Sequence, residues 1–158
     1  MNVIVIGAGY VGLANGAVLA EAHAVTLIDT NKKRVDDINS VKCPFYDPEL
    51  ETRLKELNAK GRKLRAQNTL NPEAAKSAEL IIIAVPTNYS DEICGFDTSA
   101  VDTVAEEAMR MAPQATIVIK STVPIGYTNA LVKRLGTSHI IVSPEFLKEG
   151  AAYRDCKE

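Results

Sequence analysis

The feature that most constrains this chain is a glycine-rich turn near its start, Gly7-Ala8-Gly9-Tyr10-Val11-Gly12. It directly follows the apolar run 3–6 and leads into residues 10–22, which are rich in Ala, Leu and Val. The first glycine permits a sharp turn, the second lets a phosphate approach the backbone, and the third lets a helix pack closely on a strand. A helix starting there would offer free N–H groups to an anion. The turn therefore predicts a strand–turn–helix unit that binds the pyrophosphate of a dinucleotide.

An acidic residue stands where the second strand of this unit would end. The apolar run 25–28 leads into Asp29, about 20 residues after Gly7, where a carboxylate can accept hydrogen bonds from ribose hydroxyls. That carboxylate would repel a 2′-phosphate and so favours NAD over NADP, although the basic residues 32–34 could soften the repulsion. Arg34 is expected either to stack on the adenine or to pair with Asp29. The alternative is a turn that only packs a helix against a strand.

Short apolar runs alternate with helical patterns along the rest of the chain. Five runs are rich in β-branched residues and lie at 3–6, 25–28, 80–85, 116–119 and 139–142. Such runs are typical of strands buried on both faces of a parallel sheet, and a weaker run at 63–66 predicts a sheet edge. Helical patterns occupy residues 10–22, 31–39, 48–57 and 99–111. We therefore expect an α/β fold of the Rossmann type, with a doubly wound, mainly parallel six-stranded sheet and helices on both faces.

Two local predictions refine this picture. Ser99 and Asp102 have the spacing of a capping box, which predicts that Ser99 caps the helix over 99–111. Residues 87–97 show no clear periodicity and are predicted to form a loop on the ligand side of the sheet.

Composition excludes several classes of protein. The chain has 18 basic and 20 acidic side chains, a balance that argues against a nucleic-acid partner. Its three cysteines (Cys43, Cys94 and Cys156) form no CxxC pair, and its two histidines are far apart in the sequence. We expect no metal site, no disulfide framework and a reducing, cytoplasmic location. The apolar start is too short for a signal sequence or membrane span, so no membrane partner is expected.

Polar segments follow the later strands, where a doubly wound sheet binds its ligands. They read VPTN at 85–88, KSTVPIG at 120–126 and SPEFLKEG at 143–150. With GAGYVGL, Asp29 and the FDTS segment at 96–99, they resemble the N-terminal domain of the UDP-glucose/GDP-mannose dehydrogenase family, most closely the bacterial UDP-glucose 6-dehydrogenases. The resemblance runs from Met1 to about Arg154. It implies oxidation of a nucleotide-sugar, UDP-glucose, to UDP-glucuronate with consumption of water and reduction of two NAD.

The resemblance also implies roles for individual residues. Beside the glycine turn, it implies that the NAD site contains Asp29, Arg34, Val85, Pro86, Thr87, Ser121, Thr122 and Glu149. It implies that the sugar nucleotide lies against Glu145, Phe146, Leu147, Lys148 and Glu149. Thr122 and Glu145 would hold a catalytic water, with Glu145 as the general base of thioester hydrolysis. The alternatives are capping or ion-pairing roles for the two carboxylates and turn-forming roles for the two threonines.

The resemblance leaves part of this chemistry outside the chain. The nucleophilic cysteine of the family, with its lysine and asparagine, would lie beyond residue 158, and none of the three cysteines present takes that role. We expect an NAD-binding domain at 1–150 and, at 151–158, the start of a helix leading to an absent substrate-binding half. Such a chain would bind NAD and be catalytically incomplete, and the whole enzyme would be a homodimer. The alternatives are a nucleotide-sensing regulatory module and another NAD-dependent dehydrogenase of the hydroxyacid type.

Overall fold

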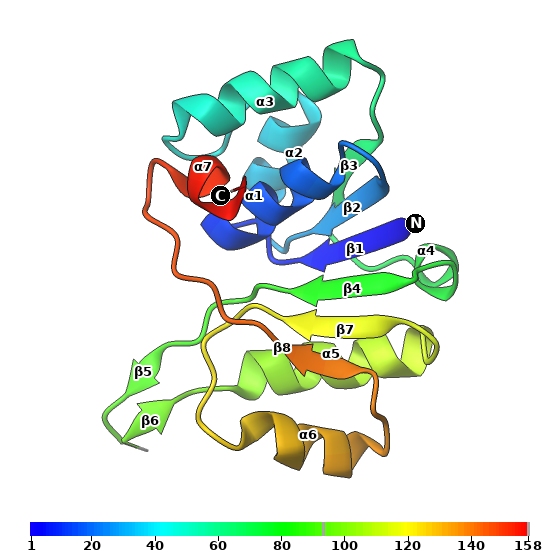
Figure 1. Ribbon diagram of the computed structural model, residues 1–158, viewed down its shortest axis with the longest axis vertical. Coiled ribbons are helices and arrows are strands. Elements are labelled where there is room, and N and C mark those ends of the chain that lie inside the picture. The colour runs from blue at the N-terminus through cyan, green and yellow to red at the C-terminus, as the bar shows by residue number, and fades with distance from the viewer. Residues whose placement is uncertain (93, 158) are drawn as a thin grey trace.

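A parallel sheet of six strands forms the centre of the computed structural model, which describes residues 1–92 and 94–157 (Figure 1). The strands are β1 (Asn2–Ile6), β2 (Ala24–Ile28), β3 (Leu64–Gln67), β4 (Leu80–Ile83), β7 (Thr116–Ile119) and β8 (Ile140–Val142). Their order is β3-β2-β1-β4-β7-β8, and every neighbouring pair is parallel. The chain thus reverses its winding direction at β1, as in a Rossmann fold. The predicted doubly wound sheet is confirmed, with the weak run at 63–66 belonging to an edge strand.

Helices cover both faces of the sheet, which explains why its central strands are mainly apolar. One face carries α1 (Tyr10–Leu19), α2 (Lys32–Asn39), α3 (Pro48–Ala59) and α7 (Ala152–Lys157), and the other carries α4 (Pro72–Lys76), α5 (Ser99–Met111) and α6 (Tyr127–Leu135). Alternate residues of β1 serve the two cores: Val3 and Val5 pack under α1 and α3, and Ile4 packs under α5. This is the period-two alternation of a strand with two buried faces.

Two helices were not predicted from the sequence, and each gave a weak signal. α4 has five residues, too few to show a helical period. α6 carries a stripe of only three residues, Tyr127, Leu131 and Leu135, and of these only Leu131 is fully buried. None of the helices described in residues 1–92 and 94–157 is long and apolar enough to cross a membrane.

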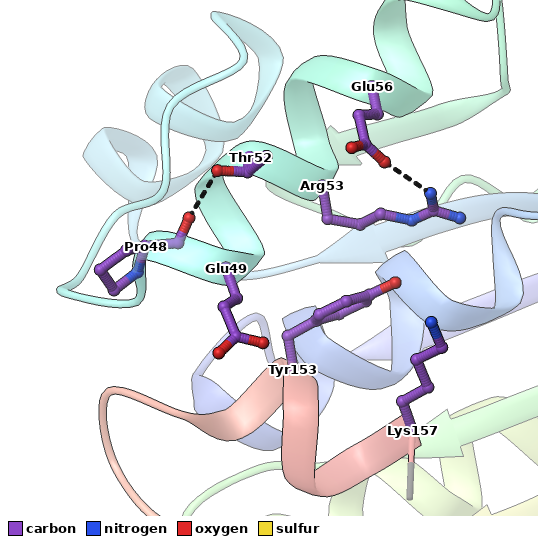
Figure 2. Close-up of a pocket in the computed structure, with 7 residues that line it drawn as sticks. All are labelled: Pro48, Glu49, Thr52, Arg53, Glu56, Tyr153 and Lys157. Atoms are coloured by element: carbon purple, nitrogen blue, oxygen red, sulfur yellow. Dashed lines mark hydrogen bonds and ion pairs between the residues drawn. The ribbon is translucent and has the colours of Figure 1, made fainter.

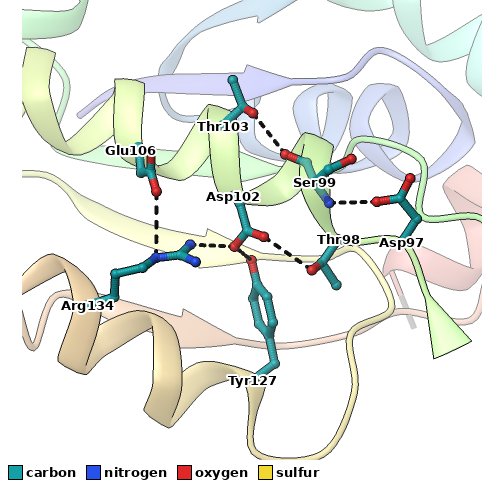
Figure 3. Close-up of polar contacts among 8 residues, drawn as sticks. All are labelled: Asp97, Thr98, Ser99, Asp102, Thr103, Glu106, Tyr127 and Arg134. Carbon is teal, nitrogen blue, oxygen red and sulfur yellow. Dashed lines mark hydrogen bonds and ion pairs between the residues drawn. The ribbon is translucent and has the colours of Figure 1, made fainter. Parts of the chain in front are cut away.

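The predicted capping box at the start of α5 is wrong. Thr98 is the N-cap and Ser99 the first helical residue, whose N–H donates to Oδ1 of Asp97 at 2.9 Å. Figure 3 shows that Asp102 instead accepts hydrogen bonds from the hydroxyls of Thr98 and Tyr127. Asp102 thus joins α5 to α6, a tertiary contact that outweighs the local capping pattern.

The segment predicted as a loop at 87–97 contains a small antiparallel ribbon. Its strands are β5 (Tyr89–Ser90) and β6 (Gly95–Phe96), and the Tyr89 and Phe96 rings meet edge to face with centroids 5.9 Å apart. Ile93 lies outside the described residues. The ribbon extends away from the carboxyl ends of the strands (Figure 1).

The segment after β8 leads from that edge of the sheet to the face that carries α1 and α3. There the last helix, α7, packs against α1 and α3. The buried Asp47 fastens it: Oδ1 accepts the N–H of Leu50 at the start of α3, and Oδ2 accepts the N–H of Tyr153 at 3.3 Å. Figure 2 shows the Tyr153 ring beside Arg53 in the groove between α3 and α7. The segment 143–150 is therefore held across the carboxyl edge of the sheet. Glu158, predicted in the same helix, lies outside the described residues.

Candidate functional site

Packing within the protein requires glycine at two of the three glycine positions of the turn. Gly7 has φ +95°, and a Cβ on it would lie 2.4 Å from the Ala84 carbonyl oxygen. A Cβ on Gly12 would lie 1.7 Å from the Gly7 carbonyl oxygen, far inside the distance that two non-bonded atoms can approach. These glycines let β1, α1 and β4 meet at the carboxyl edge of the sheet.

Gly9 differs because the space beside it holds no protein atom. A Cβ there would meet nothing within 4 Å. Gly9 is the N-cap of α1, and no side chain of the described residues 1–92 and 94–157 caps the start of this helix. Free N–H groups, a partial positive charge and open space together suit an anion such as a pyrophosphate.

Asp29 lies beside the turn at the end of β2 and is only 9% exposed. Its carboxylate accepts the N–H groups of Ala8 and Asn31, both at 2.8 Å, and pairs with the Arg34 guanidinium at 2.9 Å. Burial by itself raises the pKa of Asp29, but these N–H groups and Arg34 outweigh burial and bring the pKa below its usual value. Of the two expectations for Arg34, the structure shows the pairing. Oδ1 accepts only the Asn31 N–H among the described residues, so it keeps a lone pair for a ribose hydroxyl.

A cavity of about 400 Å³ lies between the start of α1 and the carboxyl ends of β4, β7 and β8. Its walls come from four separate segments: Gly9, Tyr10, Val11, Ala84, Val85, Pro86, Thr87, Lys120, Ser121, Thr122, Glu145, Phe146, Leu147 and Glu149. The fold thus brings together most of the residues predicted from the sequence. Lys148 does not line the cavity, and its N–H donates to Asp155 in α7. Asp29, at the end of β2, and Arg34, in α2, lie outside the cavity.

The hydroxyl of Ser121 has a structural task in this wall. It is buried and donates to the Val85 carbonyl oxygen at 2.6 Å, which ties the loop after β7 to the loop after β4. Thr87 and Thr122 flank this contact and line the cavity.

Glu145 is held from two sides. Its side chain is 17% exposed, and its Oε2 accepts a hydrogen bond from Asn15 Nδ2 of α1 and lies 3.6 Å from Lys120 Nζ. Glu145 therefore has an ion pair as well as a place on the cavity wall. Sequence reasoning missed both partners. The available signal was Asn15 itself, a polar residue inside an otherwise apolar helix, which calls for a partner when buried.

Comparison with known proteins bears directly on this arrangement. Residues 1–158 match the NAD binding domain of the UDP-glucose/GDP-mannose dehydrogenase family. The chain belongs to this family. The domain of this family binds NAD. The free N–H groups of α1 and the open space at Gly9 fit that cofactor.

Individual relatives are similar along nearly the whole chain. The UDP-glucose 6-dehydrogenase of Streptococcus pneumoniae is 40% identical over 156 residues, which are 98% of this chain and 38% of that protein. A UDP-glucose dehydrogenase from Pyrobaculum islandicum superposes with a TM-score of 0.82 at 30% identity, over 97% of this chain and 38% of that one. A GDP-mannose dehydrogenase from Pseudomonas aeruginosa also gives 0.82, at 28% identity, over 98% and 38%. The chain thus spans about two fifths of the length of these family members.

The cysteines are unsuited to nucleophilic chemistry. Burial raises the pKa of Cys43 to about 11, and burial beside the Glu145 carboxylate raises that of Cys156 to about 11, so both thiols stay protonated at neutral pH. Cys94 is exposed near the tip of the β5–β6 ribbon. Among the described residues no cysteine lines the cavity, and no three His, Cys, Asp or Glu side chains gather as metal ligands would.

Proposed function

We propose that this chain is the NAD-binding domain of a UDP-glucose 6-dehydrogenase. In the whole enzyme, UDP-glucose, two NAD and water give UDP-glucuronate and two NADH. The observation that carries the proposal is the 40% identity with the Streptococcus pneumoniae UDP-glucose 6-dehydrogenase over 98% of this chain. It exceeds the 28% identity with the structurally similar GDP-mannose dehydrogenase.

The cofactor would lie along the carboxyl edge of the sheet. In this proposal, the N–H groups of Val11 and Gly12 at the start of α1 receive the pyrophosphate, above the open space at Gly9. Asp29 accepts a ribose hydroxyl through Oδ1, and a shift of Arg34 would free Oδ2 for the second hydroxyl. The carboxylate disfavours a 2′-phosphate, so NAD is preferred over NADP. Bound NAD supplies the hydride acceptor.

The remaining wall would surround the reacting end of the cofactor and the sugar. Val85, Pro86 and Thr87 after β4 and Ser121 and Thr122 after β7 form the nicotinamide side. The segment 145–149 faces them and borders the sugar nucleotide, with Glu149 reaching toward the cofactor. Glu145, which lies beside Lys120, accepts a proton from a water that Thr122 helps to hold. Lys148, which lies off the cavity wall, would reach the substrate only by a rearrangement of its loop.

The 158-residue chain would bind NAD without turning over. Oxidation to a carboxylate through a thioester needs a cysteine thiolate, and both buried thiols of this chain stay protonated. We expect no NADH to form from UDP-glucose and NAD with the purified chain, measured by absorbance. Robust turnover would contradict this part of the proposal. In the whole enzyme, residues 151–158 would lead to the substrate-binding half and to a homodimer.

Calorimetric titration with NADH, NADPH and ATP tests the cofactor assignment. Asp29→Asn should weaken NADH binding by about 1.5–3 kcal/mol, the range for a hydrogen bond to a charged group. Asp36→Asn, an exposed carboxylate on neighbouring α2, is the matched control and should bind as the unchanged chain does. Equal affinity of Asp29→Asn and the unchanged chain would mean that the ribose is held elsewhere. ATP binding tighter than NADH binding would favour a nucleotide-sensing module.

A further inference from the structure

Asn15 is a buried polar residue in the middle of α1. It is 8% exposed, and the other buried residues of this helix are Gly, Ala and Leu. Its Nδ2 group donates to the Val11 carbonyl oxygen at 2.9 Å and also to Oε2 of Glu145. An unpaired buried amide would destabilise the fold, so the partner explains why a polar residue stands here. One helix therefore contacts both the phosphate end of the cavity and the carboxylate at its far wall.

The Lys120 ammonium group also lies near Oε2 of Glu145. Lys120, at the end of β7, places Nζ 3.6 Å from Oε2 of Glu145 and 3.4 Å from the Ser143 hydroxyl. Both side chains of the ion pair are mostly buried, 15% and 17% exposed, so the surrounding protein screens their attraction less than water would. Asn15 and Lys120 therefore fix the Glu145 carboxylate through Oε2, and neither uses Oε1.

A third side chain closes this cluster. The Cys156 thiol of α7 lies against the Glu145 carboxylate, where burial and the negative charge raise its pKa to about 11. The thiol therefore remains protonated at neutral pH. Residues from α1, β7 and α7 thus surround one carboxylate.

We propose that Asn15 and Lys120 are positioning residues for Glu145. They hold Oε2, and Oε1 is left as the oxygen that takes a proton from water. This inference rests on the proposed function, in which Glu145 is the general base. The hydrogen bond from Asn15 also fixes the base relative to α1, and therefore relative to the pyrophosphate site at the start of that helix.

Carboxyl-carbon NMR on the chain labelled with ¹³C-glutamate tests the inference. The Glu145 Cδ signal is identified by its loss in Glu145→Gln. It should shift in Asn15→Leu, which keeps the side-chain volume, and in Lys120→Met, and it should return toward its original position in Lys120→Arg. The matched controls are Asn58→Leu and Lys133→Met, which remove exposed side chains of the same types and should leave the signal in place. An unchanged signal in Asn15→Leu and Lys120→Met would overturn the inference.

A second measurement needs no variant, in case one fails to fold. The side-chain amide signal of Asn15 should move when acid protonates Glu145, whereas that of the exposed Asn58 should not. An Asn15 signal that does not respond would overturn the inference. NADH binding by the same unchanged sample separates the two proposals. Absence of NADH binding refutes the proposed function, whereas NADH binding with an unresponsive Asn15 signal refutes only the positioning role.

Discussion

The two walls of the cavity are built in different ways. The wall formed by the glycine turn comes from the start of the chain and is fixed by backbone contacts, such as the Gly7 N–H on the Ile28 carbonyl oxygen at 2.8 Å, with Asp29 beside it outside the cavity. The opposite wall comes from three loops after β4, β7 and β8, and side-chain contacts hold it, such as the Ser121 hydroxyl on the Val85 carbonyl. The first wall therefore cannot change at Gly7 or Gly12 without disturbing the sheet, whereas an exposed side chain of the second wall, such as Phe146, can change at little cost in stability.

The largest expected effect tests the turn wall. Gly12→Ala would place a Cβ 1.7 Å from the Gly7 carbonyl oxygen, so α1 must move away from β1. We expect a loss on the order of 3 kcal/mol or more in the free energy of unfolding, and a fall of roughly 10 °C in the thermal midpoint. Calorimetry or circular dichroism measures both quantities.

Gly9→Ala is the matched control for this change, because its Cβ would meet no protein atom. It should cost about 1 kcal/mol or less in stability and still weaken NADH binding by about tenfold, since the methyl group enters the phosphate space. Equal stability losses in the two variants would show that the turn wall is not fixed in the way described.

An intermediate effect is expected at Asp29. Asp29→Ala leaves the Ala8 and Asn31 N–H groups and Arg34 without their acceptor, which should lower the free energy of unfolding by about 1–3 kcal/mol at neutral pH. Asp36→Ala, which removes an exposed carboxylate, should change it by less than about 0.5 kcal/mol. Chemical denaturation measures both.

The pH dependence of this difference follows from the lowered pKa of Asp29. A carboxylate whose pKa is lowered in the folded state stabilises the protein at pH values above 3.8, its pKa in the unfolded chain. This stabilisation is lost as the pH falls through the pKa of the folded state. The gap between the unchanged chain and Asp29→Ala should therefore stay constant from neutral pH down to about pH 5 and narrow below pH 3.8. A gap that widens in acid would contradict the hydrogen bonding assigned to this carboxylate.

The smallest effect is expected on the loop wall. Phe146 is 86% exposed, so Phe146→Ala should change the free energy of unfolding by less than about 0.5 kcal/mol. Phe45→Ala removes a ring that packs against Tyr10 at 4.1 Å between centroids, beside the turn wall, and should cost more. If Phe146→Ala lowered the thermal midpoint more than Phe45→Ala does, the loop wall would not be the more tolerant of the two walls.

Sequence reasoning succeeded where a signal is local and failed where a distant residue decides. The central strands of the sheet were predicted from continuous apolar runs, because these strands are buried on both faces, whereas the edge strand β3 gave only a weak run. The capping box at Ser99 was wrong, because Asp102 bonds to Tyr127 of α6. The contact of Asn15 with Glu145, 130 positions away, could not be foreseen from either segment alone.

The sequence by itself determined the strand–turn–helix unit and the acidic residue at the end of β2, and close backbone packing leaves no alternative to glycine at Gly7 and Gly12. It also determined the family, through motifs in a fixed order. Only the tertiary structure decided which oxygen of Glu145 is held, that Arg34 pairs with Asp29, and that Lys148 lies off the cavity wall. The physical reason is that backbone geometry acts between neighbours in the chain, whereas ion pairs and buried hydrogen bonds join residues that meet only after the sheet has formed.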